Sequence, residues 1–184
     1  ILGDNIFYGD NFINKHLRPT IDSGLPSIFA YRVNDPGRYG VVEFDENRKV
    51  ISVEEKPEDP KSHYAITGLY VFDKHAPEIA QSLKPSPRGE TEIVDMIHYY
   101  RKQGNLNVSL LGRGLAWLDT GTHDSLLEAS TFIEVMEKRQ GVKIACIEEI
   151  AYHKKYIDLD QLKKITIPLQ NSSYGRYIKN DVIG

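Results

Sequence analysis

The chain has 184 residues, of which 40% are hydrophobic and 27% charged, and its formal net charge is -3. This composition is ordinary for a globular protein with a sizeable core, and the slight acidic excess argues against general nucleic-acid binding. The single cysteine, Cys146, excludes an internal disulfide and favours a reducing, cytoplasmic compartment, while no apolar run reaches membrane-spanning length.

The start of the chain predicts a truncated first element. Residues 1–5 (ILGDN) are typical of the last residues of a buried strand, which places Asp4 at that strand's carboxyl end. Because the chain opens at Ile1 and its two methionines lie far inside the sequence, we expect a fragment or a processed chain.

The rest of the chain alternates predicted helices and strands. Apolar residues that recur every three or four positions predict helices, and β-rich runs between turn signals predict strands. The predicted helices are 10–24, 76–83, 92–104, about 122–139, 147–153 and 159–165, and the predicted strands are 25–33, 41–45, 49–54, 64–73, 106–112 and 115–119. This alternation indicates one α/β domain over residues 1–184, with a helical subregion from about residue 141 and a loose C-terminal end.

The longest predicted helix begins after Thr122, whose hydroxyl can cap it. Its apolar residues are expected to turn inward, and a core or a subunit interface would satisfy them equally. These residues are Leu126, Leu127, Phe132, Ile133 and Met136.

Two aspartates mark the ends of predicted strands. Asp4 follows the first apolar run, and Asp119 stands in the stretch WLDTGTHD at the end of another strand. Ligands of open α/β sheets bind outside the carboxyl ends of strands, and two carboxylates held together there repel unless a cation lies between them. Mg²⁺ suits such a pair, because it takes one or two carboxylates and completes its shell with water and phosphate oxygens. Capping of a helix or a turn is the alternative role.

A charged tetrapeptide, Glu54-Glu55-Lys56-Pro57, follows the predicted hairpin. Strand alternation places Glu54 and Lys56 on one face and Glu55 on the other, if the strand extends that far. A lysine can bind a phosphate and a glutamate can bind sugar hydroxyls. A charged hairpin edge is the alternative.

Two further stretches combine arginine with glycine. Arg88-Gly89 precedes a predicted helix, where the guanidinium can bind a phosphate with two donors, or can simply be solvated in a turn. In Arg38-Tyr39-Gly40, the glycine lets a ligand approach the backbone, or only shapes a hairpin.

Taken together and in order, six motifs resemble glucose-1-phosphate thymidylyltransferases, a family of sugar nucleotidyltransferases of bacterial dTDP-rhamnose synthesis. The motifs are LGDNIFYG, RYGVVEFD, EEKP, YAITGLYVFD, RGETEI and WLDTGTHDSLLEAS, and the resemblance runs from Leu2 to about Ile167. It implies a Rossmann-like nucleotidyltransferase fold with a mixed sheet, truncated at its N-terminus and followed by C-terminal helices.

The resemblance also implies a role for individual residues. Asp4 and Asp119 correspond to the ligands of Mg²⁺, which is the implied cofactor. Lys56 and Arg88 correspond to the catalytic cations that hold the sugar phosphate. The remaining implied substrate contacts are Asn5, Gly40, Glu55 and Ile66.

The implied reaction joins dTTP and glucose 1-phosphate into dTDP-glucose and pyrophosphate. A homo-oligomer is also implied, with a regulatory nucleotide site at a subunit interface that includes Tyr8, Gly9, Glu149 and Ile150.

The family's glycine-rich GGxGTRL loop, which wraps the triphosphate, is not found in these 184 residues. We therefore expect the isolated chain to be inactive or nearly so. Two alternatives stay open: a non-catalytic module that binds sugar nucleotides or assembles with other subunits, and the same fold acting on UTP.

Overall fold

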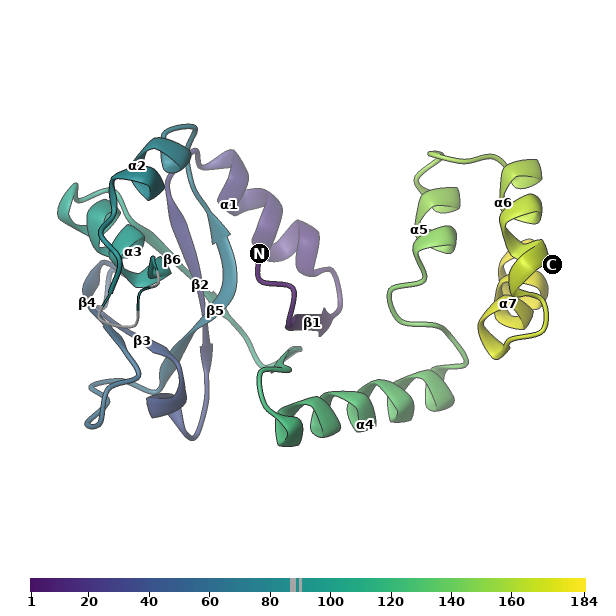
Figure 1. Ribbon diagram of the computed structural model, residues 1–184, viewed down its shortest axis with the longest axis horizontal. Coiled ribbons are helices and arrows are strands. Elements are labelled where there is room, and N and C mark those ends of the chain that lie inside the picture. The colour runs from purple at the N-terminus through teal and green to yellow at the C-terminus, as the bar shows by residue number, and fades with distance from the viewer. Residues whose placement is uncertain (87–88, 90) are drawn as a thin grey trace. The chain divides into compact units, whose positions relative to one another are not determined.

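The computed structural model describes residues 1–86, 89 and 91–184 (Figure 1). Contacts between Cα atoms divide the chain into two compact units, Ile1–Ser125 and Leu126–Gly184, and each is described by itself. The predicted single domain with a helical subregion from about residue 141 stays a prediction.

The first unit is built on a five-stranded mixed sheet in the order β4-β3-β5-β2-β6. Strand β2 pairs in parallel with β6, and the other neighbours are antiparallel. The strands are β2 (Ser27–Arg32), β3 (Gly40–Phe44), β4 (Val50–Glu55), β5 (Tyr64–Val71) and β6 (Asn107–Leu111). Each of them was predicted from the sequence to within a few residues.

Both faces of this sheet are covered by apolar side chains. Along β2, Ile28 and Ala30 join a core that includes α2 (Ala76–Ser82) and α3 (Ile93–Lys102). Phe29 faces the opposite side and packs with Leu69, Leu111 and Leu115. Because successive strand residues point to opposite faces, one strand contributes to both cores.

The segment predicted as the first helix forms two consecutive helical pieces beside β2. A π-helical turn, η1 (Ile13–Leu17), continues into α1 (Arg18–Asp22). Gly24 follows with a φ of +65°. This left-handed conformation is common at the end of a helix, and glycine adopts it without a steric penalty. A short 3-10 turn, η2 (Pro36–Arg38), precedes β3.

A separate antiparallel ribbon pairs β1 (Asn5–Gly9) with β7 (Leu115–Asp119), in a register that sets Asn5 opposite Asp119. The prediction that Asp4 ends a strand is wrong, because Asp4 lies directly before β1. The pairing still brings the two aspartates together, since the beginning of one antiparallel strand meets the end of its partner. Gly9 is required by packing, because a Cβ there would lie 2.7 Å from the backbone carbonyl oxygen of Gly114.

The second unit is helical. It contains the greater part of α4 (His123–Gln140) and the shorter helices that follow it. They are α5 (Ile147–His153), α6 (Leu159–Thr166), η3 (Ile167–Leu169), α7 (Ser173–Tyr177) and η4 (Ile178–Ile183). Their core is Cys146, Leu162, Tyr177 and Ile178. The predicted loose C-terminal end is wrong, because Ile178 is fully buried and η4 continues to Ile183.

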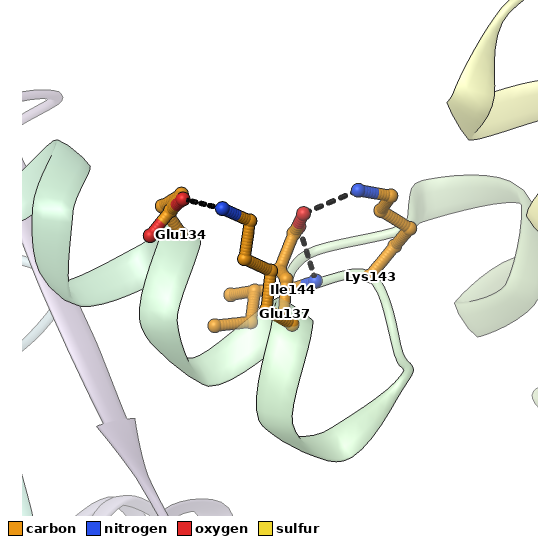
Figure 2. Close-up of polar contacts among 5 residues, drawn as sticks. Glu134, Glu137, Lys143 and Ile144 are labelled. Atoms are coloured by element: carbon orange, nitrogen blue, oxygen red, sulfur yellow. Dashed lines mark hydrogen bonds and ion pairs between the residues drawn. The ribbon is translucent and has the colours of Figure 1, made fainter.

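Helix α4 is capped as predicted, with the Thr122 hydroxyl accepting a hydrogen bond from the Ser125 amide at 3.1 Å. Near its other end, Glu137 forms an ion pair with Lys143 and accepts a hydrogen bond from the Ile144 amide at 3.1 Å (Figure 2). No described helix is long and apolar enough to cross a membrane.

The inward orientation predicted for two apolar residues of α4 is wrong. Leu126 and Leu127 are 50% and 68% exposed. Helical periodicity identified an apolar stripe but could not tell which element, if any, covers it. A subunit interface at these residues stays a prediction.

Candidate active site

A cavity of about 430 Å³ in the first unit gathers most of the residues that the sequence singled out. Among its lining residues are Asp4, Asn5, Gly40, Glu55, Lys56, Ile66 and Asp119. Arg88, the second predicted cation, lies outside the described residues. Seven of the eight residues assigned to catalysis, substrate and metal therefore share one cavity.

The β1–β7 ribbon fixes the backbone around the two aspartates. The Thr120 amide donates to the Asp4 carbonyl oxygen at 2.9 Å, and the Thr120 hydroxyl donates to the same oxygen at 3.1 Å. A Cβ placed on Gly121 would lie 3.5 Å from Asp119 Oδ2 and 3.8 Å from Asp4 Oδ2. Both Oδ2 atoms therefore border the same small volume, and the glycine leaves that volume open.

This donor set fits a hard divalent cation. Carboxylate oxygens suit Mg²⁺, which usually binds through one or two carboxylates and keeps water or phosphate oxygens as its other ligands. Among the described residues, no cluster of three or more His, Cys, Asp or Glu could hold a metal ion. Asp4 and Asp119, whose Oδ2 atoms border the shared volume, would hold such a cation.

Each aspartate is held by a neighbouring side chain. The Tyr39 hydroxyl donates to Asp119 Oδ1 at 2.8 Å, and Asn5 Nδ2 donates to Asp4 Oδ1 at 2.8 Å. Burial, followed by the hydrogen bond to Asp119, raises the pKa of Tyr39 to about 12. The tyrosine therefore stays protonated near neutral pH and remains a hydrogen-bond donor.

Asn5 is itself fixed by two donors from other strands. Its Oδ1 accepts from the Trp117 indole N–H at 2.6 Å and from the Gly68 amide at 3.0 Å. The predicted contact between Asn5 and a bound sugar nucleotide stays a prediction.

Three predicted sugar contacts lie side by side on the sheet. Gly40 pairs with Glu55 across β3 and β4. A Cβ on Gly40 would lie 3.2 Å from Glu55 Oε2, which is a crowded distance, and 3.7 Å from Ile66 Cδ1, which is ordinary contact. The result is a carboxylate beside an apolar wall, an arrangement suited to the hydroxyls and the ring face of a sugar.

The alternation predicted for Glu54, Glu55 and Lys56 required a strand through Lys56, and the strand does not extend that far. Strand β4 ends at Glu55, and Lys56 has a φ of +46°, which is uncommon for a residue with a side chain. Both Glu55 and Lys56 consequently line the cavity, with Lys56 Nζ 4.0 Å from Glu55 Oε1. Glu54 instead forms an ion pair with Lys61 at 2.8 Å.

Several residues that line the cavity were not assigned a role in the site from the sequence, and four of them are Tyr39, Gly68, Tyr70 and Trp117. Burial, together with the charges of Glu55 and Asp4, raises the pKa of Tyr70 to about 12. All four stand inside or beside the quoted motifs RYG, TGLY and WLDTG. Their position in those motifs was the available signal, but a role for each needed the contacts between strands.

The four residues predicted for a regulatory site are divided between the two units. Tyr8 and Gly9 belong to β1, whereas Glu149 and Ile150 belong to α5. Glu149 Oε2 accepts a hydrogen bond from Tyr177 at 2.9 Å, and Ile150 is 48% exposed. The regulatory site stays a prediction.

The fold and the cavity define an α/β protein that sets a carboxylate pair beside a lysine and a glutamate at one end of a mixed sheet. The chain belongs to the nucleotidyl transferase family, whose model matches residues 1–135. This result confirms the wider nucleotidyltransferase class that the motifs indicated.

Curated relatives from several bacteria carry the name glucose-1-phosphate thymidylyltransferase, and two of them illustrate the match. The protein of Xanthomonas campestris is 50% identical over 178 residues, which cover 97% of this chain and 60% of the relative. The protein of Mycolicibacterium smegmatis is 51% identical over 177 residues, which cover 96% of this chain and 61% of the relative. The chain therefore spans about 60% of the length of these relatives.

Solved structures confirm the Rossmann-like nucleotidyltransferase fold. A glucose-1-phosphate thymidylyltransferase structure from Bacillus anthracis, in complex with sucrose, is 40% identical with a TM-score of 0.61, over 72% of this chain and 52% of that one. A UDP-glucose pyrophosphorylase complexed with UDP-glucose matches with a TM-score of 0.61 over 71% of this chain and 53% of that one; at 22% identity it shows the fold alone.

Proposed function

We propose that this chain supplies the sugar-phosphate and metal-binding part of a glucose-1-phosphate thymidylyltransferase. The reaction transfers a thymidylyl group from dTTP to glucose 1-phosphate, and the products are dTDP-glucose for dTDP-rhamnose synthesis and pyrophosphate. The observation that carries the proposal is the shared cavity of Asp4, Asp119, Glu55 and Lys56. The names of the relatives support the choice of substrates.

The chemistry requires positioning and neutralisation of charge rather than a protein nucleophile. An oxygen of the sugar phosphate attacks the α-phosphorus of dTTP, and the bond to the leaving pyrophosphate breaks in line with the attack. Lys56 holds the attacking phosphate, with Arg88 as the second proposed cation. Asp4 and Asp119 would hold Mg²⁺, which would supply positive charge to offset the negative charge at the α-phosphate.

The sugar would be selected on the other side of the cavity. Glu55 accepts hydrogen bonds from glucose hydroxyls, Ile66 packs against the ring, and Gly40 leaves room for the sugar beside the backbone. This reaction uses cytoplasmic nucleotides, so we also propose the cytoplasm as its compartment. The family resemblance is the basis for proposing a homo-oligomer as its form.

The test is pyrophosphate release from dTTP and glucose 1-phosphate with Mg²⁺. We would compare the 184-residue chain with the same chain joined to the N-terminal segment of the Xanthomonas campestris relative, and use Asp119→Asn of the joined protein as the control. The proposal is supported if the joined protein is active and its Asp119→Asn variant is not. An inactive joined protein that still binds dTDP-glucose would favour a non-catalytic binding module, and faster release from UTP than from dTTP would change the assigned nucleotide.

A further inference from the structure

We propose that Tyr39 and Asn5 are positioning residues, each of which holds one oxygen of a metal-binding carboxylate so that the other oxygen faces the shared cation position. The inference rests on the proposed function, because it takes Asp119 and Asp4 as the metal ligands. It adds the support of Asp4 to the substrate contact predicted for Asn5.

The hydrogen bonds of Asn5 fix the orientation of its amide. Two N–H groups, from Trp117 and Gly68, point at one end of the side chain. Only the carbonyl oxygen can accept from both, so the NH₂ group must face Asp4, where it donates to Oδ1 at 2.8 Å. An aspartate at position 5 could not replace it, because a second carboxylate would then face Asp4.

Gly68 makes this arrangement possible. A Cβ at position 68 would lie 2.6 Å from Asn5 Nδ2 and 2.9 Å from Asn5 Oδ1, closer than real Cβ contacts occur. The amide of Asn5 thus occupies space that a glycine on β5 leaves free. Any larger residue at position 68 would displace Asn5 and the carboxylate it holds.

The indole of Trp117 links the supports of the two carboxylates. Its N–H binds Asn5, while its ring meets the Tyr39 ring edge-on, with centroids 5.1 Å apart. Tyr39 donates to Asp119 Oδ1, and the Gly121 amide donates to Asp119 Oδ2 at 3.3 Å. One aromatic side chain therefore restricts the movement of both residues that orient the aspartates.

Oriented carboxylates bind a cation more tightly because less side-chain freedom is lost on binding. Removal of outer hydrogen-bonding partners at metal sites typically weakens metal affinity by about 10- to 100-fold. We expect the lower part of that range for Tyr39→Phe, which keeps the aromatic ring and removes only the hydroxyl.

The experiment is a titration of the 184-residue chain with Mn²⁺, a paramagnetic substitute for Mg²⁺, followed by electron paramagnetic resonance of the free ion. Asp119→Asn defines binding at the proposed site. Tyr39→Phe tests the positioning role, and Tyr177→Phe is the matched control, because it removes a tyrosine–carboxylate hydrogen bond in the second unit. Circular dichroism confirms that each variant is folded.

Three results together would support the proposal. Asp119→Asn abolishes Mn²⁺ binding, Tyr39→Phe weakens it by about tenfold, and Tyr177→Phe leaves it unchanged. Equal affinity of Tyr39→Phe and the unmodified chain would overturn the positioning role while the metal site stands. Binding that does not depend on Asp119 would remove the metal site itself, and the positioning role with it.

Asn5→Ala provides a second test through Trp117, the sole tryptophan of the chain. We expect weaker Mn²⁺ binding together with a shifted fluorescence emission, because the indole loses its hydrogen-bond acceptor. A folded Asn5→Ala variant with unchanged Mn²⁺ affinity would show that Asn5 does not act through Asp4.

Discussion

The two units contain the same pair of chemical groups in different surroundings. In the first unit Tyr39 donates to Asp119 at 2.8 Å, and in the second Tyr177 donates to Glu149 at 2.9 Å. Burial raises the pKa of both tyrosines to about 12. Hydrogen bonding alone therefore does not distinguish a candidate active site from a structural contact.

The difference lies in the second oxygen of each carboxylate. Asp119 Oδ2 borders a small open volume that it shares with Asp4, whereas Glu149 Oε1 lies 3.8 Å from His153 Nε2. Two aspartates held together repel unless a cation lies between them, whereas the hydrogen bond from Tyr177 to Glu149 joins α7 to α5. The comparison predicts that changes in the second unit affect stability, and that changes around Asp119 affect binding.

The largest expected effect on stability comes from Leu162→Ala. Leu162 is fully buried in the core of the second unit. Its truncation should lower the free energy of unfolding by about 2–5 kcal/mol, because a cavity replaces packed side-chain atoms. Leu127→Ala, at a 68% exposed position, is the control, and calorimetry should show a change within about 0.5 kcal/mol. Equal effects of the two variants would contradict the assigned core.

Asp119→Asn should reduce the turnover of the joined protein by on the order of 10²-fold or more, by analogy with other deleted electrostatic stabilisers. The amide cannot supply the negative charge that a divalent cation needs. The rate of pyrophosphate release at saturating Mg²⁺ measures the effect, and turnover equal to that of the unmodified protein would remove Asp119 from the mechanism.

Gly68→Ala should combine both kinds of effect. The added methyl group would overlap Asn5, so we expect a loss of about 1–3 kcal/mol in unfolding free energy together with weaker Mn²⁺ binding. Gly112→Ala is the matched control, because a Cβ at position 112 would meet no atom within 4 Å. If the two variants behave alike in both measurements, the close approach at Gly68 has no consequence.

Tyr177→Phe should cost about 1 kcal/mol of stability, the net value of a typical hydrogen bond. Glu149 keeps its neighbour His153, so the carboxylate is not left without a polar partner. Chemical denaturation measures the cost. A loss of Mn²⁺ affinity in this variant would contradict the separation of roles between the units.

The smallest expected effect is the pH dependence that Glu137 contributes. Burial alone would raise the pKa of this carboxyl, but the hydrogen bonds from Lys143 and the Ile144 amide outweigh it and hold the pKa below its ordinary value of 4.5. A carboxyl whose pKa is depressed in the folded state stabilises the protein above its unfolded pKa, and this contribution is lost as the pH falls through the folded pKa. We would measure the free energy of unfolding from pH 6 down through the folded pKa of Glu137. This free energy should fall less for Glu137→Gln than for the unmodified chain.

The family resemblance grouped Asp4, Glu55 and Asp119, and all three line one cavity. Local patterns in the sequence predicted most elements, as the apolar spacing of Ile93, Met96, Ile97 and Tyr100 predicted α3. These predictions succeeded because periodicity and turn residues act over a few neighbouring positions.

The errors concern contacts that no local pattern contains. Asp4 was wrongly predicted to end a strand. The strand that follows it, β1, forms by pairing with β7, and the residues of β7 lie far along the chain. The orientation of Lys56 followed from a single left-handed residue that strand alternation cannot anticipate. The roles of Tyr39 and Gly68 required knowledge of which strands lie beside each other.

The ribbon that pairs β1 with β7 also has a consequence for how the protein folds. Its hydrogen bonds join Thr120 to Asp4, 116 positions apart, so nearly all of the first unit lies inside one closed loop. Contacts of such long range form slowly, because the entropy of closure is lost before any contact compensates it. A cation that binds both aspartates would hold the two ends of this loop together. At a hundredfold excess over its dissociation constant, it would add about 2.7 kcal/mol to the stability of the first unit.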